Sequence, residues 1–156
     1  MSKTHEFTAD IVWTGNRGQG TKHYRGYDRT WRIATPGHVS IECSNDPLLG
    51  GDPSKPNPED LLLSSLAACH MLWYLHLASN AGIIVRGYED APLGIGETGT
   101  RGEGRFLQAV LRPKISVERG TDLVKADSLH HDVHQFCFIA RSVNFPVTYQ
   151  ARYTEV

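Results

Sequence analysis

The sequence predicts an α+β fold, and three observations predict it. Short β-rich segments separated by turn residues occupy residues 5–44. A long apolar segment that opens with a helix-start signal follows at residues 57–80, and beyond it further β-rich segments flank a second stretch with helical spacing. Strands and helices arranged in this order along 156 residues are typical of a single α+β domain, here residues 1–156.

Three strands are expected first, as a meander. Their segments are rich in β-branched and aromatic residues and read HEFTADIVWTG (5–15), YRGYDRTWRIAT (24–35) and HVSIECS (38–44). Glycine-rich NRGQGT separates the first two segments, and Pro36-Gly37 separates the last two. A Pro/Gly-rich loop at residues 44–58 then leads into the first helix.

The first helix is expected to begin at Asn57-Pro58-Glu59-Asp60. This tetrapeptide has an N-cap residue, a proline at the first helical position and acids in the first turn. From Leu61 onward the segment is apolar nearly all round, which is typical of a central, buried helix. Because its apolar run is slightly short for a bilayer and carries serines and histidines, we interpret it as buried in protein. It should end near residues 80–82.

The remaining elements complete the α+β pattern. Strands are expected in IIVRGYEDAPLGI (83–95), in GEGRFLQAVLRPKISVE (102–118, bounded by Arg112-Pro113) and in PVTYQARYTE (146–155). Residues 121–142 show helical spacing of apolar residues at Leu123, Leu129, Val133, Phe136 and Ala140. The predicted order is three strands, a buried helix, two or three strands, a second helix and a last strand.

Composition and charge exclude several classes of partner. Hydrophobic residues make up 40%, charged residues 21%, and the net charge is −1 without a block of like charge. This gives no support for a nucleic-acid or membrane partner. The amino terminus, MSKTHEFTAD, lacks the apolar segment of a secretory signal, and with three cysteines we expect a reducing, cytoplasmic location.

Cys69 and Cys137 are the strongest candidates for chemically reactive residues. Each is expected in the middle of a helical segment on an apolar background, where a free cysteine is commonly a small core residue. A reactive role would require a nearby cation, because only the thiolate is a nucleophile and an apolar site disfavours it. Candidate cations are Arg17, Arg25, Arg29 and Arg141. Glu59 could pair with such an arginine, or could instead cap the helix.

The spacing of Glu59 and Cys69 bears on the oligomeric state. They are ten positions apart, so on one straight helix they lie roughly 15 Å from each other. If Glu59 serves the Cys69 site, a second copy of the chain is its natural source. A homodimer would also explain a helix that is apolar on every face.

Two motifs carry a resemblance to a known family. NPEDLLLSSLAACH (57–70) is similar to the signature of the osmotically inducible protein C and organic hydroperoxide resistance (OsmC/Ohr) superfamily. In the second half, LHHDVHQFCFIARSVNFPV (129–147) resembles that family's His-x-x-Cys segment, with His134 and Cys137 in place. The segment departs from the family's pattern at Phe138, where many members have proline.

The resemblance implies an OsmC-like fold, with antiparallel sheets packed on two central helices in an intertwined homodimer. It also implies a thiol-dependent peroxidase that acts in the oxidative stress response. Cys69 would be the peroxidatic nucleophile, Cys137 the resolving thiol and Glu59 the residue that orients an arginine. TGNRGQGT (14–21) is similar to the family's first turn and favours Arg17, while Arg29 would suit a strand that faces the site.

The implied reaction needs no metal or cofactor. The sulfenic acid left on Cys69 would condense with Cys137 to a disulfide. An external dithiol, for which a lipoyl-type compound is one candidate, would restore both thiols. Four apolar residues near the motifs favour a bulky organic hydroperoxide over hydrogen peroxide, although each also fits plain core packing: Met71, Trp73, Phe136 and Phe138.

Two other functions remain open at this point. His130, His134 and Cys137 are spaced i, i+4 and i+7 and could bind zinc from one helix face, with His70 adjoining Cys69. Alternatively, the chain could be a non-catalytic, stress-related binding dimer on the same scaffold. The third cysteine, Cys43, ends a predicted strand with no activating neighbour and is interpreted as structural.

Overall fold

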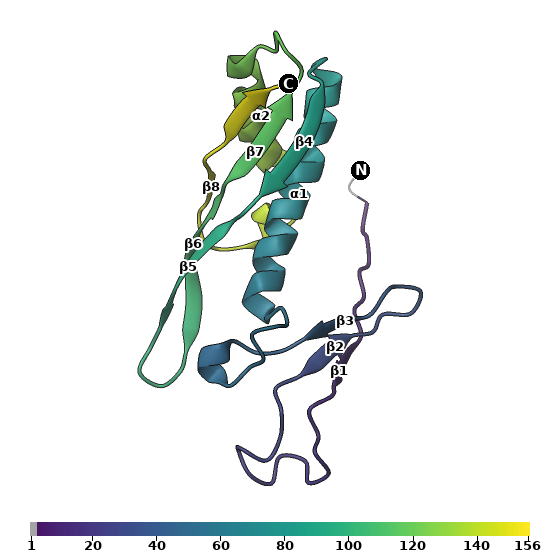
Figure 1. Ribbon diagram of the computed structural model, residues 1–156, viewed down its shortest axis with the longest axis vertical. Helices are drawn as coiled ribbons and strands as arrows, with labels where there is room; N and C mark the ends of the chain where they lie inside the picture. The colour runs from purple at the N-terminus through teal and green to yellow at the C-terminus, as the bar shows by residue number, and fades with distance from the viewer. Residues whose placement is uncertain (1–2) are drawn as a thin grey trace. The chain divides into compact units, whose positions relative to one another are not determined.

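The structure is a computed structural model that describes residues 3–156. The chain forms two compact units, Met1–Leu61 (the N-terminal unit) and Leu62–Val156 (the C-terminal unit). The two units are described separately below, and Figure 1 shows their elements. The α+β fold class predicted from the sequence is confirmed, while a single domain over residues 1–156 stays a prediction.

The N-terminal unit contains the predicted meander. Strands β1 (Ile11–Trp13), β2 (Trp31–Ile33) and β3 (Ile41–Cys43) pair antiparallel in the order β1-β2-β3. Each strand has three residues, so the predicted segments are strands only at their centres. A short 3-10 helix, η1 (Pro47–Leu49), lies in the Pro/Gly-rich loop that follows.

Helix α1 (Pro58–Asn80) begins and ends where the sequence predicts. The Asp60 backbone N–H donates to Asn57 Oδ1 (2.8 Å), and the Asn57 N–H donates back to Asp60 Oδ2 (3.1 Å). This reciprocal cap satisfies two backbone groups that a helix start leaves unpaired. Past the end of α1, Gly82 adopts a left-handed conformation (φ 73°) that most other residues would avoid.

Only one face of α1 is buried in the described chain. Its buried residues recur at helical spacing and are Leu66, Ala67, His70, Tyr74 and Ala78. On another face, Leu72 is 63% exposed. By length and composition alone α1 could cross a membrane, a test that the core helix of a soluble protein also passes.

The C-terminal unit contains six strands in two sheets. The first sheet has the order β4 (Val85–Asp90), β7 (Pro113–Val117), β9 (Arg152–Glu155). The second has the order β5 (Leu93–Thr98), β6 (Gly104–Leu111), β8 (Val147–Tyr149). The predicted count of three or four strands here was too low. Each predicted segment breaks in the middle and crosses from one sheet to the other, which a single run of β-rich residues does not reveal. The β6–β8 and β7–β9 pairs are parallel, so the sheets are mixed rather than purely antiparallel.

Helix α2 (Leu123–Phe136) is shorter than predicted. The Asp122 side chain caps its start by accepting from the Lys125 N–H (3.0 Å). At Cys137 the backbone leaves the helical conformation (φ −64°, ψ 105°), and residues Ala140–Ser142 form the separate 3-10 helix η2. The expectation that Cys137 lies in mid-helix is therefore wrong: it is the C-cap residue.

The hydrophobic core belongs to the C-terminal unit. Figure 1 shows α1 and α2 behind the layer formed by its strands. The two helices and the strands contribute the fully buried side chains Leu66, Tyr74, Leu111, Ile115 and Val133. At Gly94 on β5, a methyl group would lie 2.5 Å from the Phe106 ring and 3.0 Å from Leu63. Glycine there lets α1 approach the sheet closely.

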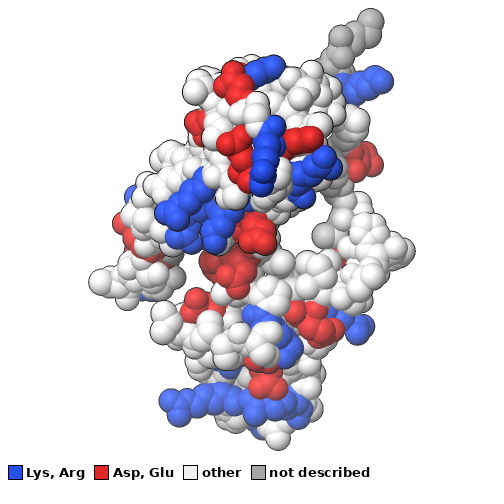
Figure 2. Space-filling model, turned by 45° about the horizontal axis from the view of Figure 1, so that its top comes forward, with Lys and Arg blue, Asp and Glu red and all other residues white. Residues whose placement is uncertain are grey.

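Acidic and basic side chains are intermixed on the face of the molecule that Figure 2 shows. Within the C-terminal unit, Arg105 pairs with Glu97 across β5 and β6 (2.7 Å), and Arg86 pairs with Glu118 (2.9 Å). Exposed pairs of this kind add little stability.

Candidate active site

The structure brings Cys69 and Cys137 together within the C-terminal unit. Cys69 lies on α1, half-buried against the core, and Cys137 lies fully buried at the end of α2. The Cys69 side chain lies near enough to Cys137 to raise the pKa of the Cys137 thiol. Neither cysteine is in a disulfide in the structure.

The surroundings of Cys137 keep its thiol protonated. Burial, followed by the neighbouring Cys69 thiol, raises the pKa of Cys137 to about 11. The Ala140 backbone N–H donates to the Cys137 sulfur (3.4 Å) and acts in the opposite direction. At neutral pH Cys137 therefore stays a thiol, which is a weaker nucleophile than a thiolate.

Glu59 does not cap α1. The cap is made by Asn57 and Asp60, and the exposed Glu59 side chain makes no hydrogen bond or ion pair within residues 3–156. The capping role that the sequence allows for Glu59 is therefore filled by Asp60. Its carboxylate is available to an arginine.

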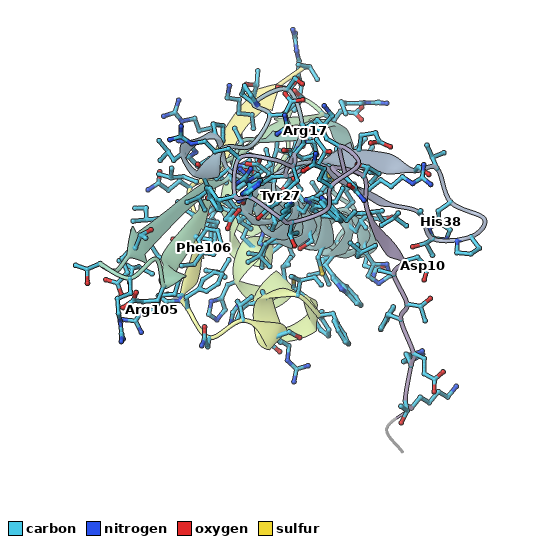
Figure 3. The ribbon with its side chains drawn as sticks, turned by 90° about the horizontal axis from the view of Figure 1, so that it is seen from below. Asp10, Arg17, Tyr27, His38, Arg105 and Phe106 are labelled. Carbon is cyan, nitrogen blue, oxygen red and sulfur yellow. The ribbon has the colours of Figure 1, made fainter. Side chains whose placement is uncertain are left out.

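The two candidate arginines differ in how firmly they are held in the N-terminal unit. Arg17, labelled in Figure 3, lies on the loop between β1 and β2, donates to the Arg25 carbonyl (2.7 Å) and pairs with Asp28 (3.5 Å). Arg29 donates to the carbonyls of Tyr27 (2.8 Å) and Tyr24 (2.9 Å). Its guanidinium also lies over both tyrosine rings, 4.2 and 4.6 Å from their centroids. Arg29 is therefore a structural anchor of its loop, whereas the ion pair of Arg17 is solvent-exposed.

The four predicted substrate-contacting residues form no single pocket wall. Trp73 stacks on Phe136, with ring centroids 5.0 Å apart and planes at 26°. Met71 is half-buried, and Phe138 is 60% exposed. None of the four lines the cavity described below. Their contact with substrate stays a prediction.

The predicted zinc ligands do not converge. Among residues 3–156, no group of three or more His, Cys, Asp or Glu side chains is arranged to hold a metal ion. The Nδ1 atom of His130 instead lies 2.7 Å from Nε2 of His70, while His134 is exposed. Cys43 is fully buried at the end of β3, as expected of a structural cysteine, and burial raises its pKa.

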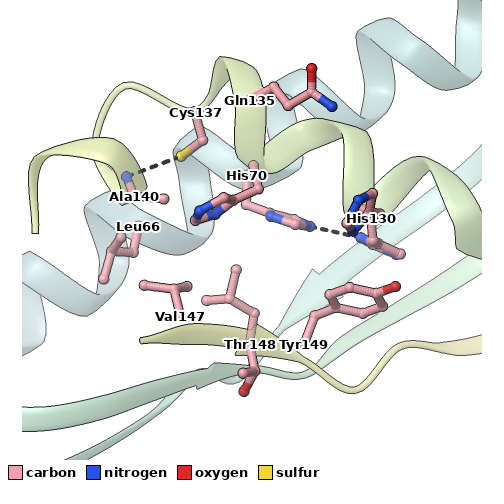
Figure 4. A pocket seen from close by; sticks show the side chains of 12 residues that line it. Leu66, His70, His130, Gln135, Cys137, Ala140, Val147, Thr148 and Tyr149 are labelled. Carbon is pink, nitrogen blue, oxygen red and sulfur yellow. Dashed lines mark hydrogen bonds between the residues drawn. The ribbon is translucent and has the colours of Figure 1, made fainter. Parts of the chain in front are cut away.

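The buried pair of His70 and His130 is the feature that sequence reasoning missed. Both line a cavity of about 430 Å³ in the C-terminal unit, which Figure 4 shows together with Cys137 and Tyr149. The only sequence signal was position, since His70 follows Cys69 and His130 precedes Cys137 by two helical turns. That signal suggested metal ligands, because nothing local shows that two histidines sixty residues apart bind each other.

Comparison with protein-family models shows which family this chain belongs to. The family model for OsmC-like proteins matches residues 51–151, which include both cysteines, the His70–His130 pair and Glu59. The chain belongs to the OsmC-like family. The resemblance noted in the two cysteine motifs is thereby confirmed.

Solved structures of other OsmC-like proteins share the fold. An OsmC-like protein of unknown function from Vibrio cholerae is 25% identical, with a TM-score of 0.85 over 96% of this chain and 100% of that one. An organic hydroperoxide resistance protein from Elizabethkingia anophelis is 17% identical, with a TM-score of 0.68 over 99% and 100% of the two chains. An organic hydroperoxide resistance protein OsmC from Legionella pneumophila is 18% identical, with a TM-score of 0.66 over 98% and 100%. Among curated proteins, none matches this chain.

Proposed function

We propose that this OsmC-like protein is a thiol-dependent peroxidase that reduces organic hydroperoxides to alcohols. The observation that carries the proposal is the pair of free thiols, Cys69 and Cys137, which lie close enough together for Cys69 to raise the pKa of Cys137. Family membership supports it, since structural neighbours are named organic hydroperoxide resistance proteins.

Cys69 is the proposed nucleophile. Its thiolate attacks the O–O bond of the hydroperoxide, an S–O bond forms, and the alkoxide leaves and takes up a proton to become the alcohol. Cys69 is oxidised to sulfenic acid, and the hydroperoxide is reduced by two electrons. Half-burial on α1 gives this sulfur both access and an apolar surrounding that suits an organic substrate.

Cys137 is the proposed resolving thiol. Its sulfur attacks the sulfenic sulfur, an S–S bond forms and the S–O bond breaks, and the departing hydroxide leaves as water with the Cys137 proton. Because its raised pKa keeps Cys137 a thiol in the reduced protein, Cys137 must give up its proton as it attacks, and the departing hydroxide takes that proton up. An external dithiol then reduces the disulfide by thiol–disulfide exchange and is itself oxidised to a disulfide.

The proposal includes a homodimer with Glu59 and an arginine at each site. Glu59 lies about ten residues, or roughly 15 Å, before Cys69 along α1, so a second copy is its natural source. Exposed apolar residues on α1, such as Leu72, would be covered by the same partner. Of the two arginines, we favour Arg17 to stabilise the thiolate, because its ion pair is solvent-exposed, whereas Arg29 donates to two carbonyls and stacks on two tyrosine rings. A cytoplasmic location, where dithiol reductants are at work, is part of this proposal.

The test is consumption of cumene hydroperoxide by the purified protein in the presence of dithiothreitol. Many turnovers per chain are expected, with hydrogen peroxide consumed more slowly at equal concentration. Consumption no faster than with dithiothreitol alone would contradict the proposal.

A further inference from the structure

The hydrogen bond between His70 and His130 joins helices α1 and α2 inside the C-terminal unit. Nε2 of His70 and Nδ1 of His130 are 2.7 Å apart, and the planes of the two rings are at 12°. His70 is 6% exposed and His130 is 1% exposed. Within residues 3–156, this is the one hydrogen bond that links a side chain of α1 to a side chain of α2. The pair is therefore a specific link between the two helices.

Both histidines are neutral at neutral pH. Burial lowers the pKa of His70 to about 4 and that of His130 to about 3, and a neighbouring histidine lowers each of them further. A neutral imidazole has one nitrogen that donates and one that accepts, so one ring can donate to the other. The link therefore persists at neutral pH and places no charge in the core.

The His130 ring is also held by tyrosines from two elements. Tyr74, from α1, stacks on it with ring centroids 4.3 Å apart, and Tyr149, from β8, with centroids 4.7 Å apart. Close packing of this kind leaves a buried ring little freedom to move. His130 thus contacts α1 through both His70 and Tyr74, which lie one helical turn apart. These two contacts oppose both sliding and rotation of α2 against α1.

The histidine pair adds less stability than an apolar pair would. Nε2 of His130 is buried and has no hydrogen-bond partner in the described part of the chain. A buried polar atom without a partner is destabilising, whereas an apolar pair of similar size would pack without this penalty. A hydrogen bond differs from an apolar contact in that it is directional. What the pair contributes is a defined arrangement of the two helices.

The two cysteines lie on the same two helices, beside this link. Cys69 directly precedes His70 on α1. Cys137 follows His130 by seven positions, about two helical turns, so the two positions share a face of α2. Figure 4 shows the bonded histidines and Cys137 in one view. Because Cys69 also lies near Cys137, α1 and α2 meet at two neighbouring places, one between histidines and one between cysteines.

A disulfide between these cysteines depends on how the helices lie. A bridge requires Cα atoms within about 7 Å of each other and side chains that point towards each other. Cys137 is the C-cap residue of α2, so the place of α2 against α1 decides where its sulfur lies. A contact that fixes this place also fixes the approach of the two sulfurs.

We propose that the His70–His130 hydrogen bond positions the two cysteines, by holding α1 and α2 in the arrangement in which a Cys69–Cys137 disulfide forms. Both histidines act through the helices that carry the cysteines, so they are positioning residues. The inference deepens the proposed function and rests on it, since the disulfide is the product of the proposed resolving step.

The experiment measures the stability of the Cys69–Cys137 disulfide without peroxide. Purified protein is equilibrated in buffers with graded ratios of oxidised to reduced dithiothreitol. Oxidised dithiothreitol takes up the two electrons and two protons that the cysteine thiols lose as their S–S bond forms. Acid quenching, alkylation and mass spectrometry of the digest then give the fraction of chains with the bridge, and hence its equilibrium constant.

His130→Phe removes the hydrogen bond and keeps a ring between the two tyrosines. Without the bond, the reduced protein gains freedom in how α1 and α2 lie, and closing the bridge must remove that freedom. The effective concentration of one thiol at the other, and with it the equilibrium constant, should fall about tenfold. For a two-electron couple this is a rise of about 30 mV in the reduction potential. His70→Phe breaks the same bond from α1 and should have the same effect.

The double variant tests whether the two histidines act as one bond. Because each single substitution already removes that bond, His70→Phe combined with His130→Phe should lower the equilibrium constant about tenfold. Independent effects that multiply to about a hundredfold would overturn the assignment to the hydrogen bond.

Two controls separate positioning from stability. Ile115→Ala weakens the same core from β7 and destabilises the dithiol and disulfide forms alike, so the equilibrium constant should stay within about twofold of the wild type. His76→Phe makes the same substitution at an exposed histidine of α1 and should also stay within about twofold.

A measurement on the wild type stands if a variant fails to fold. In ¹⁵N-labelled protein, the coupling across the hydrogen bond between His70 Nε2 and His130 Nδ1 should be present in both the dithiol and the disulfide form. Its absence from the disulfide form would overturn the proposal, since the bond would not belong to the arrangement in which the bridge forms.

The outcomes distinguish this inference from the proposed function. Equilibrium constants within about twofold of the wild type in both phenylalanine variants would overturn the positioning role and leave the peroxidase standing. A tenfold loss in these variants of a protein that consumes no hydroperoxide would refute the peroxidase and leave the positioning role standing.

Discussion

The two compact units of this OsmC-like protein differ in how much apolar surface they bury. The C-terminal unit has a continuous core that includes Leu66, Tyr74 and Ile115, each almost wholly buried. In the N-terminal unit, Cys43 is the one buried hydrophobic side chain among the described residues. Large apolar side chains there are instead exposed, and include Phe7, Ile11, Trp13 and Ile41.

The difference shows that secondary structure and stability have separate origins in this chain. Local sequence places three short strands in the N-terminal unit, but these strands lack the buried hydrophobic face that a small sheet needs to be stable by itself in water. Apolar surface of this kind usually marks an interface. The C-terminal unit holds the thiols and the histidine pair and can stabilise them with its own core. The predictions below contrast the two units, from the largest expected effect to the smallest.

The largest expected contrast between the two units is the effect of a cysteine substitution on hydroperoxide turnover. Cys69→Ser in the C-terminal unit removes the proposed nucleophile and should lower cumene hydroperoxide turnover about a thousandfold or more. Cys43→Ser, in the N-terminal unit, should keep turnover within about twofold of the wild type in the same assay with dithiothreitol. A Cys69→Ser variant with wild-type turnover would exclude Cys69 as the nucleophile.

Matched isoleucines compare the stability of the two units. Ile115→Ala creates a cavity in the core, since Ile115 is 1% exposed, and should cost about 2–5 kcal/mol of unfolding free energy in urea. Ile41→Ala, at 44% exposure, should cost less than about 0.5 kcal/mol in protein dilute enough to be monomeric.

Protein concentration sharpens this comparison. If a second copy covers the N-terminal unit, the cost of Ile41→Ala rises with concentration, whereas that of Ile115→Ala does not. A large cost of Ile41→Ala in the monomer would mean that the N-terminal unit has a core of its own.

Acid should destabilise the C-terminal unit through its buried histidines. The folded-state pKa values of His70 (about 4) and His130 (about 3) lie below the unfolded value of 6.5. Between those values the unfolded chain binds more protons, so stability falls as pH decreases from about 6.5 towards 4, by at most about 1.4 kcal/mol per pH unit for each histidine.

Urea unfolding at several pH values measures this slope. The His130→Phe variant should have a shallower slope than the wild type over pH 4–6.5. His76→Gln, which changes an exposed histidine, should leave the slope as it is. A wild-type stability that is flat across this range would argue that the histidine pair is not buried and neutral in solution.

The smallest expected contrast is the loss of unfolding free energy when the cap of α1 or of α2 is removed. Asn57, in the N-terminal unit, is 9% exposed and caps α1 reciprocally with Asp60, whereas the exposed Asp122 caps α2. Asn57→Ala should cost about 1–2 kcal/mol in thermal or urea unfolding, and Asp122→Ala about 0.5–1 kcal/mol. The reverse order would contradict the view that the α1 cap is the tighter of the two.

Local signals predicted the elements whose causes are local. The Asn57–Asp60 tetrapeptide fixed the start of α1 because capping depends on four neighbouring residues. The sequence predicted too few strands near Pro92 and Arg112. At each position the chain passes from one sheet to the other, which depends on tertiary structure and not on local sequence. The end of α2 at Phe136 was missed since apolar spacing continues to Ala140 after the backbone has left the helix.

The site was predictable only where a motif marks it. Cys69 and Cys137 were found from two motifs, and the structure brings them together. The His70–His130 contact depends on how two helices pack, which no spacing along the chain encodes. The choice between Arg17 and Arg29 likewise depends on contacts formed in three dimensions, such as the stacking of Arg29 on Tyr24.

Mapping of disulfides by mass spectrometry tests the central claim most directly. Reduced protein is treated with one equivalent of cumene hydroperoxide, alkylated and digested. We expect a Cys69–Cys137 disulfide in nearly every chain, with Cys43 alkylated. Chains in which Cys69 and Cys137 are both alkylated, or are separately oxidised to sulfinic acid without a bridge, would contradict the account.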